Sequence, residues 1–194
     1  MTDVAIRRAT RAYLDLVVDI LTDAFTDDPS INYLLPPGSD RERRRRHRAA
    51  QEADVRWEYF PVGEVLVTED ELGALLWKPR GARNPSDWQQ ARSGLAYARA
   101  VGPLRAVRPR RDLEAAEKKH PTSPHGYIGE LGVRREAQGK GVGSALMRHA
   151  LAACDADGAG AYLESNSVAN LPLYRRFGFE VVDEVTMGKN GPRI

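Results

Sequence analysis

The chain predicts a mixed α/β fold, because segments with the two-residue period of strands alternate with segments of helical period. These segments follow the order β-α-α-β-β-α-β-α-β-α-β. The chain has 194 residues, enough to bury a sizeable core, and no internal repeat or flexible linker divides it. We therefore expect one domain over residues 1–194.

The first elements are a strand over residues 4–10 and a helix that ends at about Phe25, marked by apolar residues at helical spacing. A polar loop follows, and its Pro36-Pro37-Gly38 sequence is unfavourable for regular structure. Ser39 or Asp40 can cap the next helix.

This second helix carries the arginine run RERRRRHR (41–48), for which we expect a solvated face rather than a nucleic-acid site. Two β-type runs after it predict an antiparallel hairpin hinged at about residues 69–71. Residues 80–120 predict helical pieces that break at three prolines, Pro85, Pro103 and Pro109.

Residues 125–133 predict a strand in which Gly129 and Gly132 indicate a bulge or a close approach by another group. The next helix ends at Gly158, a typical C-terminal glycine. The remaining elements are a strand, a short helix and a last strand, over AYLES (161–165), NLPLYRRFG (170–178) and FEVVDEVTM (179–187).

The composition is that of an ordinary soluble protein, with 42% hydrophobic and 29% charged residues. A net charge of +2 is too small to imply a nucleic-acid partner. The single cysteine, Cys154, excludes an internal disulfide and suits a reducing compartment. The start lacks the layout of a signal peptide, and no apolar run approaches the roughly 18 residues of a spanning helix. We expect a cytoplasmic protein.

The stretch VRREAQGKGVGSALM (133–147) places glycines at alternate positions directly before a helix. Glycine raises the entropic cost of ordering the backbone, so we expect a compensating interaction. The first turn of a helix has unpaired N–H groups and the positive end of the helix dipole, which attract a phosphate. We predict an anion site here, with Lys140 and Arg134 or Arg135 neutralising further charge. A tight turn without a ligand is the alternative.

Two familiar phosphate motifs do not match this stretch. A P-loop requires Ser or Thr after Gly-Lys, whereas Gly141 follows Lys140. The dinucleotide fingerprint requires a third glycine where Ser144 or Leu146 stands. What remains is Gln138-x-x-Gly141-x-Gly143 after a strand.

This pattern resembles the [QR]-x-x-G-x-[GA] signature of the GNAT superfamily of acetyl-coenzyme A-dependent N-acetyltransferases, and Leu131-Gly132-Val133 before it is similar too. LESNSVANLPLYRRFGFEV (163–181) resembles the LYxxxGF block near the end of that superfamily. The spacing is most similar to puromycin N-acetyltransferase and related actinobacterial antibiotic-resistance enzymes. That similarity is weak from about residue 40 to 120.

The resemblance implies the GNAT fold, a twisted, mixed β-sheet flanked by helices that splays open between strands 127–133 and 161–165. Acetyl-coenzyme A is the implied co-substrate, and no metal is implied. Its pantetheine arm pairs with backbone groups of Leu131 and Val133, and Tyr174 protonates the departing thiolate. The other implied cofactor contacts are Gln138, Gly139, Lys140, Gly141, Val142, Gly143, Ser144 and Asn170. The superfamily usually has one more strand after residues 179–187, whereas this chain stops at GPRI (191–194).

Direct acetyl transfer requires a base that removes a proton from the acceptor amine. Glu164 is the first candidate, and Glu130 is the second because strand alternation points it opposite to Tyr127 and Leu131. For each glutamate, an ion pair with an arginine is the alternative. A backbone N–H near Val133 can stabilise the oxyanion.

We predict a primary amine of a small molecule as the acceptor, and the resemblance favours an antibiotic or aminonucleoside. Asp27-Asp28 border this pocket by resemblance. Four aromatic residues belong either to the pocket or to the core: Trp57, Tyr59, Trp77 and Tyr127. The alternatives are acetylation of a protein N-terminus or lysine, a non-catalytic coenzyme A sensor, and a nucleic-acid module that uses the arginine run. The oligomeric state, a homodimer included, stays open.

Overall fold

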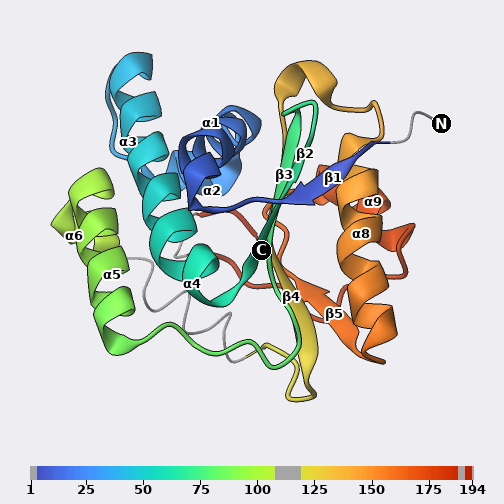
Figure 1. Ribbon diagram of the computed structural model, residues 1–194. Helices are drawn as coiled ribbons and strands as arrows, with labels where there is room; N and C mark the ends of the chain where they lie inside the picture. Colours follow the sequence, from blue (N-terminus) through green and yellow to red (C-terminus); the bar gives the residue numbers. More distant parts are fainter. Residues whose placement is uncertain (1–3, 108–118, 188–190, 194) are drawn as a thin grey trace.

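The computed structural model describes residues 4–107, 119–187 and 191–193. Its strands form one sheet in the order β1-β2-β3-β4-β5, antiparallel except for the parallel β4–β5 pair. The mixed α/β fold is therefore confirmed (Figure 1). The strands are β1 (Ile6–Arg8), β2 (Glu64–Thr68), β3 (Gly73–Lys78), β4 (His125–Val133) and β5 (Gly160–Leu163).

Helices cover both faces of this sheet (Figure 1). One face carries α1 (Leu14–Ala24), α3 (Asp40–Asp54) and α5 (Asp87–Val101), and the other carries α8 (Val142–Ala156). The shorter helices are η1 (Arg11–Tyr13), α2 (Pro29–Leu34), the π-helix η2 (Val55–Tyr59), α4 (Phe60–Val62), α6 (Pro103–Val107), η3 (Arg135–Ala137), η4 (Val168–Asn170) and α9 (Leu171–Arg175).

The core is divided between these two faces by the alternation of side chains along the strands. Val65 and Val67 of β2 pack with α1, whereas Leu66 between them packs with α8. Pro109, one of the predicted helix breaks, lies outside the described residues. No helix among the described residues is long and apolar enough to cross a membrane.

The loop between α1 and α3 is more regular than predicted, because it contains α2. Asp28 Oδ1 accepts hydrogen bonds from the N–H groups of Ser30 and Ile31, at 2.8 and 3.1 Å. Pro29 at the first helical position adds a suitable backbone angle. This N-cap starts a helix that the proline-rich sequence conceals. Ser39 caps α3 as predicted.

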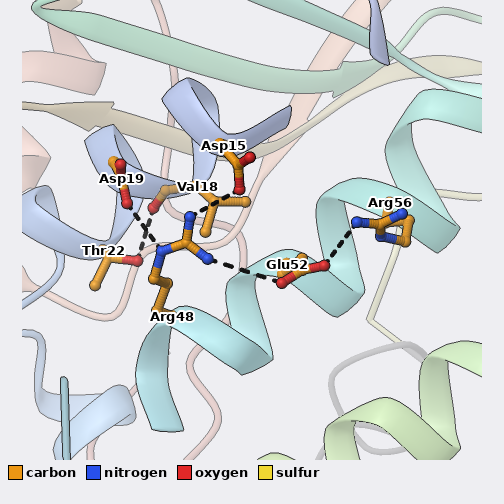
Figure 2. A network of polar contacts seen from close by, with 7 residues as sticks. All are labelled: Asp15, Val18, Asp19, Thr22, Arg48, Glu52 and Arg56. Carbon is orange, nitrogen blue, oxygen red and sulfur yellow. Dashed lines mark hydrogen bonds and ion pairs between the residues drawn. The ribbon is translucent and has the colours of Figure 1, made fainter. Parts of the chain in front are cut away.

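Part of the arginine run has a structural role that the sequence did not indicate. Arg48 of α3 binds Asp15 and Asp19 of α1 at 2.9 and 3.0 Å, and its third acidic neighbour, Glu52, also pairs with Arg56 (Figure 2). These ion pairs join α1 to α3. Arg44 and Arg45 are exposed, as a solvated face requires.

The predicted last strand over residues 179–187 is wrong. The described part of this segment has one isolated bridge, between Thr186 and Arg193, and no strand. Val181 and Val182 are exposed. Alternating apolar residues supply the period of a strand, but a strand also needs a continuous partner backbone, and among the described residues this segment pairs only through that single bridge.

Candidate active site

The sheet opens between β4 and β5. The two strands pair from His125 opposite Gly160 to Ile128 opposite Leu163, where β5 ends. Strand β4 continues to Val133, so its edge from Gly129 onward has no strand partner on this side. The splay that the resemblance implies is therefore present, and it leaves an extended backbone edge beside the opening.

A β-bulge lies in β4 at the start of this open edge. Glu130 lies opposite Leu76 of β3 and Ile128 lies opposite Trp77, so Gly129 has no partner of its own. The extra residue changes which face the following side chains reach. The predicted bulge is confirmed.

The bulge brings Glu130 to the same side of the sheet as Tyr127, and both side chains line one cavity. Leu131, one residue on, packs with the core on the α8 face. The predicted alternation that pointed Glu130 opposite to Tyr127 is therefore wrong. Gly129 is required here because a Cβ atom would collide with the Tyr59 hydroxyl.

Residues 138–144, which we call the glycine loop, connect β4 to α8. Gly139 and Gly141 have φ angles of +75° and +91°, which only glycine adopts without strain. A Cβ atom at either position would meet no atom within 4 Å, so the space above the loop is open. The turn alone thus accounts for two of the three glycines, and the open surface leaves room for a ligand.

The first turn of α8 presents unpaired donors beside this loop. Ala145 is the first residue whose N–H bonds back, to the Gly141 carbonyl at 3.0 Å, and no side chain caps the helix. The N–H groups of Val142, Gly143 and Ser144 precede that bond. Such a terminus favours an anion through its dipole and its donors.

The basic residues near the glycine loop differ in their contacts. Arg135 forms an exposed ion pair with Asp27 at 3.0 Å, and Arg134 donates to the Glu71 carbonyl at 2.9 Å. Lys140 is exposed in the loop itself. The Gln138 side chain turns back and donates to the Val133 carbonyl at 3.1 Å, which fixes the loop to the end of β4.

The open edge of β4 faces a cavity of about 480 Å³ that we call the acceptor cavity. Residues from α2, α3, η2, α5, β4 and the segment after β5 line it. It contains both candidate bases and the candidate acid. Those of its lining residues that the resemblance or the aromatic pattern had singled out are Asp28, Tyr59, Tyr127, Glu130, Leu131, Glu164, Asn170 and Tyr174.

The pKa of Glu130 suits a general base that works near neutral pH. Burial raises its pKa to about 7, with Glu58 and Asp28 adding to the shift and a hydrogen bond from Gln51 opposing it. Gln51 Nε2 donates to Glu130 Oε2 at 3.0 Å. This amide orients the carboxyl group and favours its ionised form, but burial has the larger effect on the pKa.

The carboxyl group of Glu164 has a titratable partner. Its Oε1 atom lies 3.1 Å from His120 Nε2, in a contact that is an ion pair when the histidine is protonated. The His120 ring also packs against Tyr127 and Tyr162, with centroids 5.3 and 4.6 Å apart. Glu164 therefore matches the structural alternative, with a histidine in place of the expected arginine.

Tyr174 lines both the acceptor cavity and a second cavity of about 390 Å³, which residues of β5, α9 and the segment 178–185 also line. Burial raises the pKa of its hydroxyl, and hydrogen bonding to Ser165 opposes that shift. The hydroxyl is therefore protonated at neutral pH, as a general acid requires. Its ring packs edge-to-face against Phe179. Asn170 is exposed at the start of α9.

Of the four aromatic residues, one lies in the core, two line the cavity and Trp57 does neither. Trp77 is 3% exposed in the core, and Trp57 packs edge-to-face against Trp88. Tyr59 and Tyr127 line the acceptor cavity, where burial raises the pKa of both hydroxyls.

The sequence reasoning missed the polar residues that α3 and η2 contribute to this cavity: His47, Gln51, Asp54 and Glu58. Their spacing of four, three and four residues places them on one helical face, which was a usable signal. Burial raises the pKa of Asp54 well above its usual range, with Glu130 and Glu58 adding to the shift. Three carboxyl groups thus lie close together here.

Known proteins resemble this chain over most of its length. An uncharacterized N-acetyltransferase of Schizosaccharomyces pombe is 28% identical over 183 residues, covering 90% of this chain and 73% of the relative. A solved structure described as histone acetyltransferase HPA2 and related acetyltransferase from Corynebacterium glutamicum has a TM-score of 0.72 and 26% identity, with 99% and 93% of the two chains covered.

A GCN5-related N-acetyltransferase from Ralstonia eutropha shares the fold, with a TM-score of 0.53 and 20% identity over 95% of this chain and 96% of that one. The narrower similarity to puromycin N-acetyltransferase stays a prediction. The sequence profile of the acetyltransferase (GNAT) family matches residues 54–179, well over half of the chain. The chain therefore belongs to this family of acyltransferases, which use acetyl-coenzyme A as co-substrate.

Proposed function

We propose that this chain, as one domain over residues 1–194, transfers an acetyl group from acetyl-coenzyme A directly to a primary amine of a small molecule. One observation carries the proposal. Glu130, with a pKa of about 7, and the protonated Tyr174 line the same cavity, next to the open edge of β4. A base and an acid with separate pKa values are what this reaction demands.

The proposed cofactor residues belong to the glycine loop and the open edge of β4. Backbone groups of Leu131 and Val133 pair with the pantetheine arm, and N–H groups from Gly139 to Ser144 hold the diphosphate, with Lys140 adding positive charge. The open space above Gly139 and Gly141 and the uncapped helix support this assignment.

Each protein group has one task in the transfer. Acetyl-coenzyme A supplies the thioester, whose C–S bond breaks as the new C–N bond forms. Glu130 removes the proton from the acceptor ammonium so that a neutral nitrogen can attack. Tyr174 gives its hydroxyl proton to the departing sulfur. Glu164 is the weaker candidate base, because His120 already occupies its carboxylate.

Small acceptors are favoured because helix α5 forms part of the cavity wall. Ser93, Gly94 and Tyr97 of α5 belong to its lining. Acetylation of a protein is the second candidate, because the Corynebacterium glutamicum structure described as a histone acetyltransferase is 26% identical. Antibiotic or aminonucleoside acceptors belong to the first candidate.

The test measures thiol release from acetyl-coenzyme A with small aliphatic amines, puromycin and lysine-containing peptides. We expect turnover with at least one small amine and none with peptides. Turnover with peptides alone would favour the second candidate. Calorimetry supplies the control, since tight cofactor binding without turnover of any acceptor would identify a coenzyme A sensor instead.

A further inference from the structure

The ionisable side chains that line the acceptor cavity are almost all acidic. The cavity is lined by five carboxyl side chains, and no Lys or Arg occurs among the described residues that line it. His47 adds no charge near neutral pH, because burial and two neighbouring arginines lower its pKa to about 4. The carboxyl groups are those of Asp28, Asp54, Glu58, Glu130 and Glu164. This lining favours a cationic ligand over a neutral or anionic one.

Four of these carboxyl groups already have partners. Asp28 caps α2, Glu58 pairs with Lys78 at 2.7 Å, and Glu130 accepts from Gln51. Glu164 contacts His120. Asp54 is the exception, because its carboxyl group has no hydrogen bond or ion pair with any described residue. Its side chain is half-buried and lines the cavity, so a cationic ligand in the cavity can pair with it.

Two further polar atoms in this cavity lack partners among the described residues: His47 Nε2 and Ser30 Oγ. His47 is 3% exposed and Ser30 is 5% exposed. Buried polar atoms without a partner are rare, and each calls for an explanation. His47 also lies two helical turns before Asp54, on the same face of α3. Both atoms can satisfy N–H or ammonium groups of a ligand.

The backbone at this site is unusual as well. Helix α3 continues into the π-helix η2, which carries Glu58 and Tyr59 into the cavity. Single π-helical turns occur frequently at functional sites. Between the polar groups, the aromatic rings of Tyr59, Tyr97 and Tyr127 line the cavity and can contact a hydrocarbon chain.

We propose that the acceptor is an aliphatic diamine, an inference that rests on the function proposed above. One amine loses its proton to Glu130 and is acetylated. The second stays protonated and binds the Asp54 carboxylate, with His47 and Ser30 as further hydrogen-bond partners. A monoamine leaves these three groups unsatisfied.

The test compares acceptors that differ at one end only: 1,4-diaminobutane, butylamine and 4-aminobutanoate. We expect kcat/KM from thiol release to be at least tenfold higher for the diamine than for butylamine, with 4-aminobutanoate the poorest. Asp54→Asn should lower the ratio of diamine to butylamine at least tenfold. Glu69→Gln, in the exposed turn between β2 and β3, is the matched control and should keep the ratio.

The outcomes separate this inference from the proposed function. Equal kcat/KM for diamine and butylamine, or an unchanged ratio in Asp54→Asn, would overturn the diamine and leave the acetyltransferase intact. So would turnover confined to puromycin. The wild-type ratio alone can refute the inference, whether or not the variant folds. Absence of thiol release with every amine would refute the proposed function and the inference together.

Discussion

The glycine loop and the acceptor cavity lie beside the same open edge of β4, yet they are built in opposite ways. The loop is one continuous stretch, residues 138–144, that offers backbone N–H groups at a helix terminus. The cavity collects side chains from residues as far apart as Phe25 and Met187. The loop offers dipoles and N–H groups, whereas the cavity offers carboxyl groups whose pKa depends on burial.

The two regions differ in how far a change of sequence can alter specificity. Positive φ angles at Gly139 and Gly141 restrict the loop to glycine, so its chemistry is fixed by the backbone. Positions of the cavity can change one at a time, because its lining side chains are spread over several elements. We therefore expect substitutions in the cavity to change the acceptor and its rate, and substitutions in the loop to change cofactor affinity.

The largest expected effect is on the rate, from Glu130→Gln. The amide keeps the shape and the contact with Gln51 but cannot accept the amine proton, so kcat/KM should fall by about 100-fold or more. Glu164→Gln is the matched control, and its effect should be much smaller. A larger loss in the control would assign the base to Glu164.

The pH dependence of the wild type should follow the same carboxyl group. With Glu130 as the proposed base, only its ionised form accepts the amine proton, so kcat/KM should rise with pH up to about 7 and be roughly 30-fold lower at pH 5.5 than at pH 8. A profile without a break near pH 7 would contradict this assignment.

The free energy of unfolding should fall over the pH range in which the activity rises. The folded-state pKa of Glu130 lies above its ordinary 4.5, so the native state binds more protons between pH 4.5 and about 7. The free energy of unfolding should therefore fall as pH rises through that window. At pH 8, Glu130→Gln should be more stable than wild type by roughly 1–3 kcal/mol in urea unfolding.

Tyr174→Phe removes the hydroxyl that is proposed to protonate the departing thiolate, so turnover should fall tenfold or more. The phenyl ring keeps the contact with Phe179, so acetyl-coenzyme A affinity measured by calorimetry should be nearly intact. An unchanged rate would remove Tyr174 from the mechanism.

A smaller effect, on binding rather than rate, is expected from Gly141→Ala. An alanine at φ +91° costs about 1–2 kcal/mol, which should weaken acetyl-coenzyme A binding several-fold and leave the preference among amines unchanged. Gly160→Ala is the control, because its Cβ has open space and its φ is ordinary. An altered preference among amines in Gly141→Ala would contradict the expectation that the loop affects only cofactor binding.

The smallest effect is expected away from both regions, at the ion pairs of Figure 2. Arg48→Met should lower the free energy of unfolding by about 0.5–1 kcal/mol and leave activity unchanged. The loss should shrink in 1 M salt. Arg44→Met, at an exposed position, should show no loss in the same urea titration.

The sequence predicted the elements whose signals are local. The hairpin of β2 and β3, the strand β4 and the helix α8 all lie where periodicity and glycines placed them. Helix α2 was missed because prolines conceal its cap. The strand over residues 179–187 failed because a strand depends on a partner that no local pattern supplies.

By itself, the sequence determined the fold class, the family and the glycine loop. Each depends on neighbours along the chain: helical period, positive-φ glycines and the donors of one helix end. Which of the two carboxyl groups has a raised pKa depends on the tertiary structure. A single unpaired residue, Gly129, turns Glu130 into the acceptor cavity, and the burial that raises its pKa comes from elements far away in the sequence. Desolvation depends on everything that surrounds a group in space, and so it cannot be read from the residues beside it in the chain.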